Sequence, residues 1–251
     1  MTQTKSILAI ETSTAACSVA LLHQGQSFSR FEIVPQKHAH HLLEMVDGVM
    51  TEAGIQGEEL DLLAYGEGPG AFTGVRVSAG VIQGLALGWD KPVVGISSLE
   101  AMAESAMHTV IETPLDQAEP VSWCALMDAR MGEVYFLSGV FTPKAGEWQL
   151  SETELLSPEL VEERIVALDS VQIGVGDIHN EYPQLLELFD RWLEQMPSAL
   201  SVAHIAHRRE LAGSEGRVSA RVEEKVPLPV YLRNHVADTI AERKLKQSMR
   251  D

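Results

Sequence analysis

The 251-residue sequence has only two cysteines, Cys17 and Cys124, and both lie inside apolar runs. Two buried thiols are typical of a reducing compartment and exclude a disulfide framework as the basis of the fold. Long hydrophobic runs are absent as well: none could span a bilayer, and no leader-like apolar segment precedes the first expected strand. We therefore expect a cytoplasmic protein without membrane contact.

Motifs of several enzyme classes are also missing. The sequence has no Cys-x-x-Cys pair, no phosphate-binding loop that ends in lysine, and no Gly-x-Ser-x-Gly turn. Basic residues are scarce, because 19 Lys and Arg stand against 36 Asp and Glu, for a net charge of −17. Such a charge repels phosphate backbones at long range and complements a basic protein partner. If the protein works on RNA, we expect another subunit to hold the RNA.

The first half of the sequence alternates short apolar strands with two amphipathic helices. Periodicity predicts strands at 7–10, 17–22, 27–33, 62–65 and 93–96, and helices at 38–53 and 75–87. Gly54 suits a helix C-cap, because glycine adopts positive φ without a steric penalty.

The second half repeats a similar order. Strands are predicted at 123–127, 133–140 and 171–175, and helices at 158–168 and 182–195. A strand-rich unit that occurs twice predicts an α/β fold with two ribonuclease-H-like lobes, as in the actin-like ATPases. The expected division is a first lobe at 1–112, a reduced second lobe at 113–213 and a charged tail at 214–251.

Three further expectations concern the linker, the C-terminal tail and one helix face. The polar, proline-bounded stretch 113–120 is the expected linker. The tail is expected to be solvated or frayed rather than docked. His204 and His207, next to two arginines, are expected on a solvated helix face.

A glycine-rich loop, Gly66 to Gly74, joins a predicted buried strand to a predicted helix. Backbone N–H groups at a helix N-terminus favour an anion, whereas a tight strand-to-helix crossover explains the same glycines without a ligand. Acidic and hydroxyl residues at strand ends could complete a nucleotide site, although they also suit turns and N-caps. The candidate vestigial nucleotide site comprises Glu11, Thr12, Ser13, Gly68, Gly70 and Asp128. Arg130 is close enough in sequence to pair with Asp128.

The two predicted helices of the first half carry more small and apolar surface than one core contact needs. Gly80, Gly84 and Gly88 share one helix face, although each glycine costs about 1 kcal/mol relative to alanine. Either the helix packs closely on its own sheet, or another helix approaches there. The broad apolar surface of the helix at 38–53 favours a subunit interface.

The histidine cluster at 37–41 is a candidate ligand set. His38 and His41 share a helix face, as two metal ligands would, but no third ligand follows at a suitable spacing. A polar first helical turn at an interface explains these histidines too, and we predict no metal site in this chain.

Six strings carry a family resemblance. They are ILAIETSTAACSVALL at 7–22, KHAHHLL at 37–43, GPGAFTGVR at 68–76, GISSL at 95–99, DAR with EVY at 128–135, and YLR at 231–233. Together they resemble the TsaB family, also called YeaZ. The resemblance runs in order along most of the chain, and GPGAFTGVR and DAR are its most specific parts.

The resemblance implies a role in the bacterial complex that transfers threonylcarbamoyl to adenosine 37 of tRNA. It implies pairing with TsaD, docking of the ATPase TsaE on that pair, and a homodimer when TsaD is absent. Metal and ATP are expected on the partner subunits, with no cofactor in this chain and only indirect contact with tRNA.

The resemblance also implies that the chain is a scaffold and activator rather than an enzyme. The two histidines of the TsaD metal motif correspond here to Ser98 and Met102, which are not a ligand pair for a Lewis-acidic metal. The expected partner interface comprises His38, His41, Leu42, Met45, Val46, Val49, Arg76, Val77, Gly80 and Gly84. A charge at Val46 or Val77 is expected to prevent pairing without unfolding the monomer. The alternative is an independent ATP-dependent enzyme or metallohydrolase that uses Glu11 and Asp128.

Overall fold

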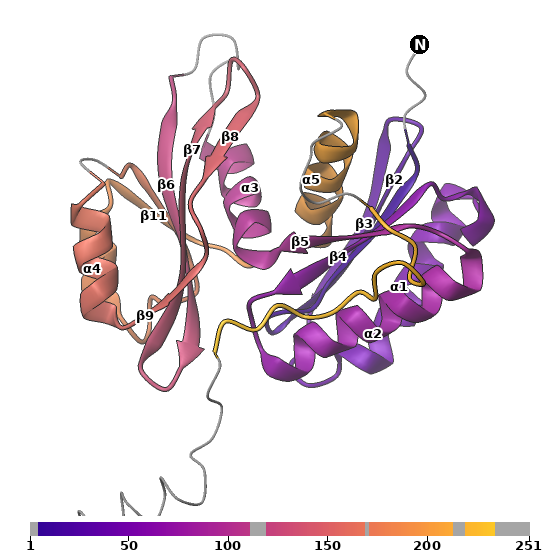
Figure 1. The fold of residues 1–251 in the computed structure, drawn as a ribbon, viewed down its shortest axis with the longest axis horizontal. Helices are drawn as coiled ribbons and strands as arrows, with labels where there is room; N and C mark the ends of the chain where they lie inside the picture. The colour runs from indigo at the N-terminus through magenta and orange to yellow at the C-terminus, as the bar shows by residue number, and fades with distance from the viewer. Residues whose placement is uncertain (1–4, 111–118, 169–170, 213–218, 234–251) are drawn as a thin grey trace, which may run out of the picture.

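The computed structural model describes residues 5–110, 119–168, 171–212 and 219–233, which form two sheets with helices on both faces of each (Figure 1). The first sheet has the order β3-β2-β1-β4-β5. Its strands are β1 (Ile7–Glu11), β2 (Ala16–His23), β3 (Gln26–Ile33), β4 (Leu62–Gly68) and β5 (Val93–Ser97). Central β1 runs antiparallel to β2 and parallel to β4. All of β1 is buried, because helices cover both of its faces.

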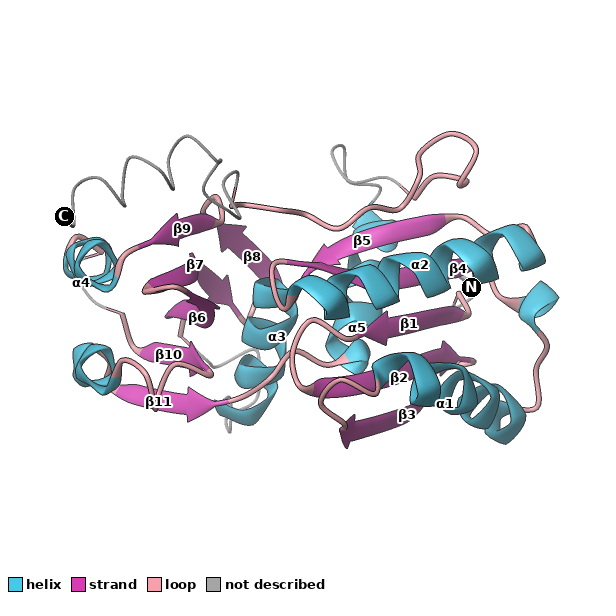
Figure 2. Ribbon diagram, turned by 90° about the horizontal axis from the view of Figure 1, so that it is seen from below, coloured by secondary structure: helices cyan, strands magenta, loops and turns pink. Residues whose placement is uncertain are grey.

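Helices α1 (His38–Ala53) and α2 (Phe72–Trp89) cover the same face of the first sheet (Figure 2). Their apolar stripes form one core with the strands. The predicted cap at Gly54 is confirmed, with φ of 72°. Helix α2 begins earlier than its apolar periodicity predicts, because its first turn packs on the backbone after β1 rather than on apolar side chains.

The second sheet has the order β11-β10-β6-β7-β8, with β9 beside β7. Its strands are β6 (Val121–Arg130), β7 (Glu133–Thr142), β8 (Glu147–Leu150), β9 (Glu154–Leu156), β10 (Ile173–Gly176) and β11 (Arg191–Glu194). Helix α4 (Pro158–Val166) covers its outer face. The predicted two-lobed actin-like fold is therefore confirmed.

The prediction of a helix at 182–195 is wrong. The segment instead forms a 3-10 helix, η2 (Pro183–Leu188), followed by β11, which pairs in parallel with β10. Phe189 and Trp192 pack on the second sheet, where a Cβ at Gly174 would lie 2.5 Å from either ring. Pairing with β10 therefore overrides the local helical spacing.

Two helices lie between the sheets, and each crosses the expected division of the chain. Helix α3 (Ser98–Val110) follows β5, yet it packs on the second sheet. Helix α5 (Ala199–Ala212) follows the second sheet, yet it packs on the first. Helix α3 was not predicted. Its polar side is buried as well as its apolar side, since Glu100 and Glu104 lie against α5, so it lacks the exposed face of an ordinary amphipathic helix.

The expectation of a solvated face for His204 and His207 is wrong for His204. Its ring lies half-buried against His108 of α3, with 5.7 Å between the ring centroids. None of the described helices combines the length and the apolarity that a membrane crossing requires.

The expectation of a solvated tail is wrong for residues 219–233. After a turn at 222–224, this segment runs in extended form along the first lobe toward the second (Figure 1). Val93 and Ala220 exchange backbone hydrogen bonds of 2.9 and 3.1 Å, and Val230 N donates to Glu67 O at 2.7 Å. The rest of the tail, 214–218 and 234–251, and most of the expected linker lie outside the described residues.

Both cysteines are buried and free, as the sequence predicts. Burial raises the pKa of the Cys17 thiol to about 11 and that of Cys124 to about 12. Both thiols are therefore protonated at neutral pH and are poor nucleophiles.

Candidate functional site

The glycine-rich loop after β4 packs tightly on the turn between β1 and β2. The backbone N–H of Ala71 donates to Ser13 O at 2.7 Å, and the Thr12 hydroxyl donates to Gly74 O at 2.8 Å. An added Cβ at Gly70 would lie 2.5 Å from Ser13 O, and one at Gly74 would lie 2.0 Å from Thr12 O. Glycine at both positions is therefore required by the close approach of two backbone segments, without any ligand.

Glu11 is turned into the protein at the end of β1 and is only 1% exposed. Its carboxylate accepts hydrogen bonds from Ser13 N at 2.5 Å and from the Ser98 hydroxyl at 2.9 Å. Gly66 leaves the space that this carboxylate fills. Burial raises the pKa of Glu11, against the opposing effect of these hydrogen bonds. The chain itself therefore supplies the partners that a bound ligand would otherwise provide.

Asp128 ends the straight part of β6 in the second lobe and binds Arg130, as predicted. Its carboxylate lies 2.9 Å from the Arg130 guanidinium and accepts a bond from Arg130 N at 2.8 Å. The candidate nucleotide residues thus lie on two sheets, and both carboxylates already have partners. That nucleotide site stays a prediction.

The α1 residues expected at a partner interface divide into a buried and an accessible group. Leu42, Met45, Val46 and Val49 are between 0 and 6% exposed and belong to the core under the first sheet. His38 is buried too. Of this group, the accessible member is His41, whose Nδ1 lies 3.7 Å from Glu32.

The α2 glycines face away from the sheet. An added Cβ at Gly80, Gly84 or Gly88 would meet no atom within 4 Å, whereas Ala79 and Ile82 fill the sheet side. The interpretation that this glycine stripe packs on its own sheet is therefore wrong. Glycine is retained on an open helix face despite its cost of about 1 kcal/mol per residue.

Exposed apolar side chains and a groove accompany the glycine stripe. Leu43 of α1 is 53% exposed and Leu87 of α2 is 57% exposed. A groove of about 490 Å³ runs between the two helices, with Leu43, Leu85 and Trp89 among its lining residues. We define this surface, from Leu43 across the groove to Gly80, Gly84 and Leu87, as the α1–α2 surface.

The two remaining interface candidates lie at the start of α2. Arg76 is exposed and stacks over the Phe72 ring at 3.5 Å, while its Nε donates to the Tyr231 hydroxyl at 2.7 Å. Val77 is partly buried against the core. The role of Tyr231 in placing Arg76 was missed from the sequence, because no local pattern connects residues so far apart.

Replacement of Glu11 by glutamine should remove a pH dependence of stability. The pKa of Glu11 is higher in the folded state than in the unfolded state, so between these two pKa values the folded protein binds the Glu11 proton more tightly. The stability of the wild type therefore falls as pH rises from the unfolded-state pKa to the folded-state pKa. Glu11→Gln keeps an acceptor for Ser13 N and carries no charge. Urea unfolding between pH 4 and pH 8 should show that the free energy of unfolding of the variant increases relative to that of wild type as pH rises. A difference that is constant across this range would contradict the raised pKa.

Comparison with known proteins places the chain in a family. A family model described as TsaD, tRNA N6-adenosine threonylcarbamoyltransferase, matches residues 31–151. The tRNA threonylcarbamoyladenosine biosynthesis protein TsaB of Escherichia coli is 39% identical, covering 92% of this chain and 96% of that protein. The protein of the same name from Haemophilus influenzae is 36% identical, with 93% and 96% covered.

Similar proteins of solved structure indicate the same family. A Pseudomonas aeruginosa protein described as similar to the peptidase YeaZ is 36% identical, with a TM-score of 0.74 over 91% of this chain and all of that one. YeaZ from the same organism is 34% identical, with a TM-score of 0.71 and the same coverage. The chain therefore belongs to the TsaB family, also called YeaZ.

Proposed function

We propose that this chain is a non-catalytic scaffold and activator that pairs with TsaD in the complex that transfers threonylcarbamoyl to adenosine 37 of tRNA. The observation that supports this most is the α1–α2 surface, where an open glycine stripe lies beside exposed leucines. Close backbone approach and surplus apolar area are what a partner helix requires. When TsaD is absent, the same surface serves a homodimer, since an isologous patch can pair with itself.

The residues that correspond to the TsaD metal ligands support a non-catalytic role. Ser98 and Met102 are both fully buried at the start of α3. The Ser98 hydroxyl donates to Glu11, and Met102 belongs to the apolar core of the second lobe. These side chains are used in internal packing and hydrogen bonding rather than facing a substrate, which supports placing the metal, ATP and the chemistry on partner subunits.

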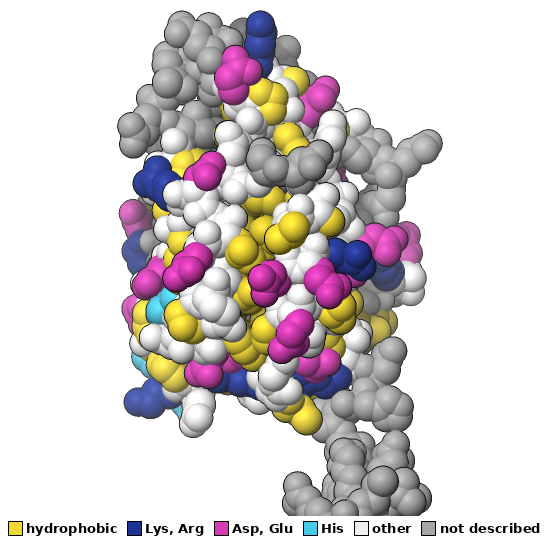
Figure 3. Space-filling view, turned by 90° about the vertical axis from the view of Figure 1, so that its left-hand side faces the viewer, with side chains coloured by type: hydrophobic (Ala, Val, Ile, Leu, Met, Phe, Trp, Pro, Cys, Tyr) yellow, Lys and Arg dark blue, Asp and Glu magenta, His cyan; other side chains and the backbone are white. Residues whose placement is uncertain are grey.

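Charge supports an indirect role toward tRNA. The centre of the outer face of the second lobe carries acidic side chains among apolar ones, with basic side chains toward its rim (Figure 3). With a net charge of −17, the chain repels a phosphate backbone. TsaD would therefore hold the tRNA, and TsaE would dock on the pair.

The test is size exclusion with light scattering, for this chain alone and mixed with TsaD from the same organism. We expect a heterodimer with wild type, and loss of affinity by about 3 kcal/mol, or about a hundredfold, for Leu43→Glu because a charge must be buried. Leu160→Glu on α4 is the matched control, since Leu160 is 47% exposed on the other lobe. Val46→Glu is unsuitable, because Val46 is 4% exposed and its replacement would unfold the monomer.

Two results would contradict the proposal. One is a heterodimer that forms equally well with Leu43→Glu, which would place the interface elsewhere. The other is a mixture in which the two chains elute separately, each with the mass that it has alone. That outcome would favour an independent ATP-dependent enzyme, and ATP binding by wild type but not by Glu11→Ala would support it.

A further inference from the structure

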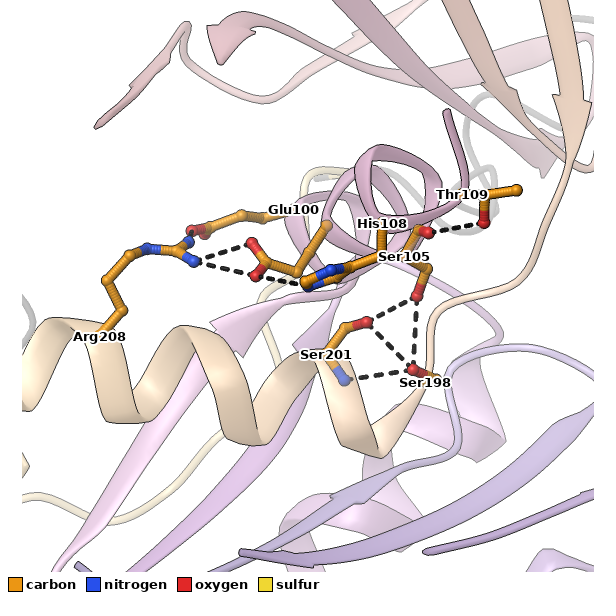
Figure 4. Close-up of polar contacts among 8 residues, drawn as sticks. Glu100, Ser105, His108, Thr109, Ser198, Ser201 and Arg208 are labelled. Atoms are coloured by element: carbon orange, nitrogen blue, oxygen red, sulfur yellow. Dashed lines mark hydrogen bonds and ion pairs between the residues drawn. The ribbon is translucent and has the colours of Figure 1, made fainter. Parts of the chain in front are cut away.

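Side chains of α3 and α5 meet in a polar seam between the two lobes (Figure 4). Glu104 and His108 are one helical turn apart on α3, and His204 comes from α5. A carboxylate oxygen of Glu104 and a ring nitrogen of each histidine all lie within 4.8 Å of one another. Two imidazoles and a carboxylate are a donor set that zinc uses with a fourth position open.

The separations are close to those of a metal site. The Nε2 of His108 lies 3.5 Å from Oε1 of Glu104. Bonds of about 2.0–2.1 Å in a tetrahedral zinc site place neighbouring ligand atoms about 3.3 Å apart. The His108 side chain is 65% exposed, so its ring can turn toward His204 without disturbing the core.

The surroundings hold the carboxylate in place. Glu104 is 6% exposed, and one Arg208 nitrogen donates to both of its oxygens, at 2.9 and 3.0 Å. A carboxylate keeps further lone pairs after such contacts, and hydrogen bonds of this kind orient metal-ligating acids. Arg208 also lies 3.9 Å from Glu100, so its charge is shared between two acids.

The charge of −17 on the whole chain raises the local concentration of cations. His204 comes far after His108 in the sequence, so only the packing of α5 on α3 brings the three groups together.

We propose that Glu104, His108 and His204 bind one divalent transition-metal ion, for which Zn²⁺ is best suited, and that this ion links the two lobes. The link follows from the packing of the helices, because α3 belongs to the core of the second sheet and α5 to that of the first. The site is separate from Ser98 and Met102 at the start of α3, and water would complete its fourth position.

Titration calorimetry of the EDTA-treated full chain with ZnCl₂ tests the proposal. We expect one equivalent to bind, and His108→Ala or His204→Ala to weaken binding by more than about tenfold. The control variants are His207→Ala on the same helix and His41→Ala in α1, which should bind as wild type. At a hundredfold excess over Kd, zinc should raise the melting temperature of wild type by about 5 °C.

Cobalt provides an independent reading of the ligands. Co²⁺ added to the same protein should give the visible bands of a four-coordinate site, and these should be absent from the His108→Ala/His204→Ala double variant. No binding by wild type would overturn the proposal. Binding that survives in the double variant, or that falls equally in His207→Ala, would overturn it too.

Discussion

Gly74→Ala is expected to destabilise the folded protein by about 3 kcal/mol or more, a large part of the 5–15 kcal/mol that stabilises a typical domain. The new methyl group would lie 2.0 Å from the carbonyl oxygen of Thr12. Neither side can yield easily, because both are backbone and because Thr12 Oγ1 also donates to Gly74 O. The turn after β1 and the first turn of α2 would have to separate.

Gly80→Ala on the same helix is the matched control. Its Cβ meets no atom within 4 Å, so alanine should stabilise the monomer by about 1 kcal/mol through helix propensity alone. Urea unfolding at low protein concentration measures both variants without interference from self-association. Equal effects at the two positions would show that the loop does not pack on the turn as described.

Arg208→Leu is expected to cost about 3 kcal/mol, because it removes the guanidinium that binds both oxygens of the buried Glu104 carboxylate. Glu100 and Glu104 are 4% and 6% exposed, and Arg208 contacts both. The matched control is Arg164→Leu, which removes a two-point contact with Glu154 that is exposed and therefore contributes about 1 kcal/mol or less. Thermal unfolding of the two variants against wild type gives the comparison.

The effect of Arg208→Leu should shrink in acid. Burial pushes the pKa of Glu104 upward, but His108 and Arg208 outweigh burial and hold it below its ordinary value. This stabilisation is present above the unfolded-state pKa and is lost as pH falls through the folded-state pKa. The variant should therefore differ most from wild type at neutral pH and least at low pH. A difference that grows in acid would contradict the arrangement.

The sequence predicts elements well where one face is apolar and the other polar. Helix α1 has the predicted bounds and cap because its buried stripe alternates with exposed residues such as Leu43 and Glu44. Helix α3 escapes prediction because packing between two lobes buries most of its sides. The segment after Pro183 has the apolar spacing of a helix, yet part of it forms β11 because it pairs with β10. Here the local pattern is clear but tertiary pairing overrides it.

The candidate site was predictable in composition more than in arrangement. The glycines of α2 indicate close approach, but only the structure shows that Gly80 and Gly84 face outward. The apolar residues of α1 were assigned to a partner interface, whereas Leu42 and Val49 have no exposed surface. Helical spacing alone cannot distinguish a stripe that meets a sheet from one that meets another protein. The polar seam around His108 depends on tertiary packing and had no local signal.

The β5 edge of the first sheet is paired by the chain itself at its first residue, where Ala220 and Val93 exchange two backbone hydrogen bonds. An open edge presents unpaired N–H and C=O groups with which a strand of another molecule can form hydrogen bonds. At the opposite edge, β3 carries exposed Arg30 and Glu32, which discourage such pairing. A version of the protein that ends before Ala220 would therefore be at risk of sheet-to-sheet aggregation even while its lobes stay folded.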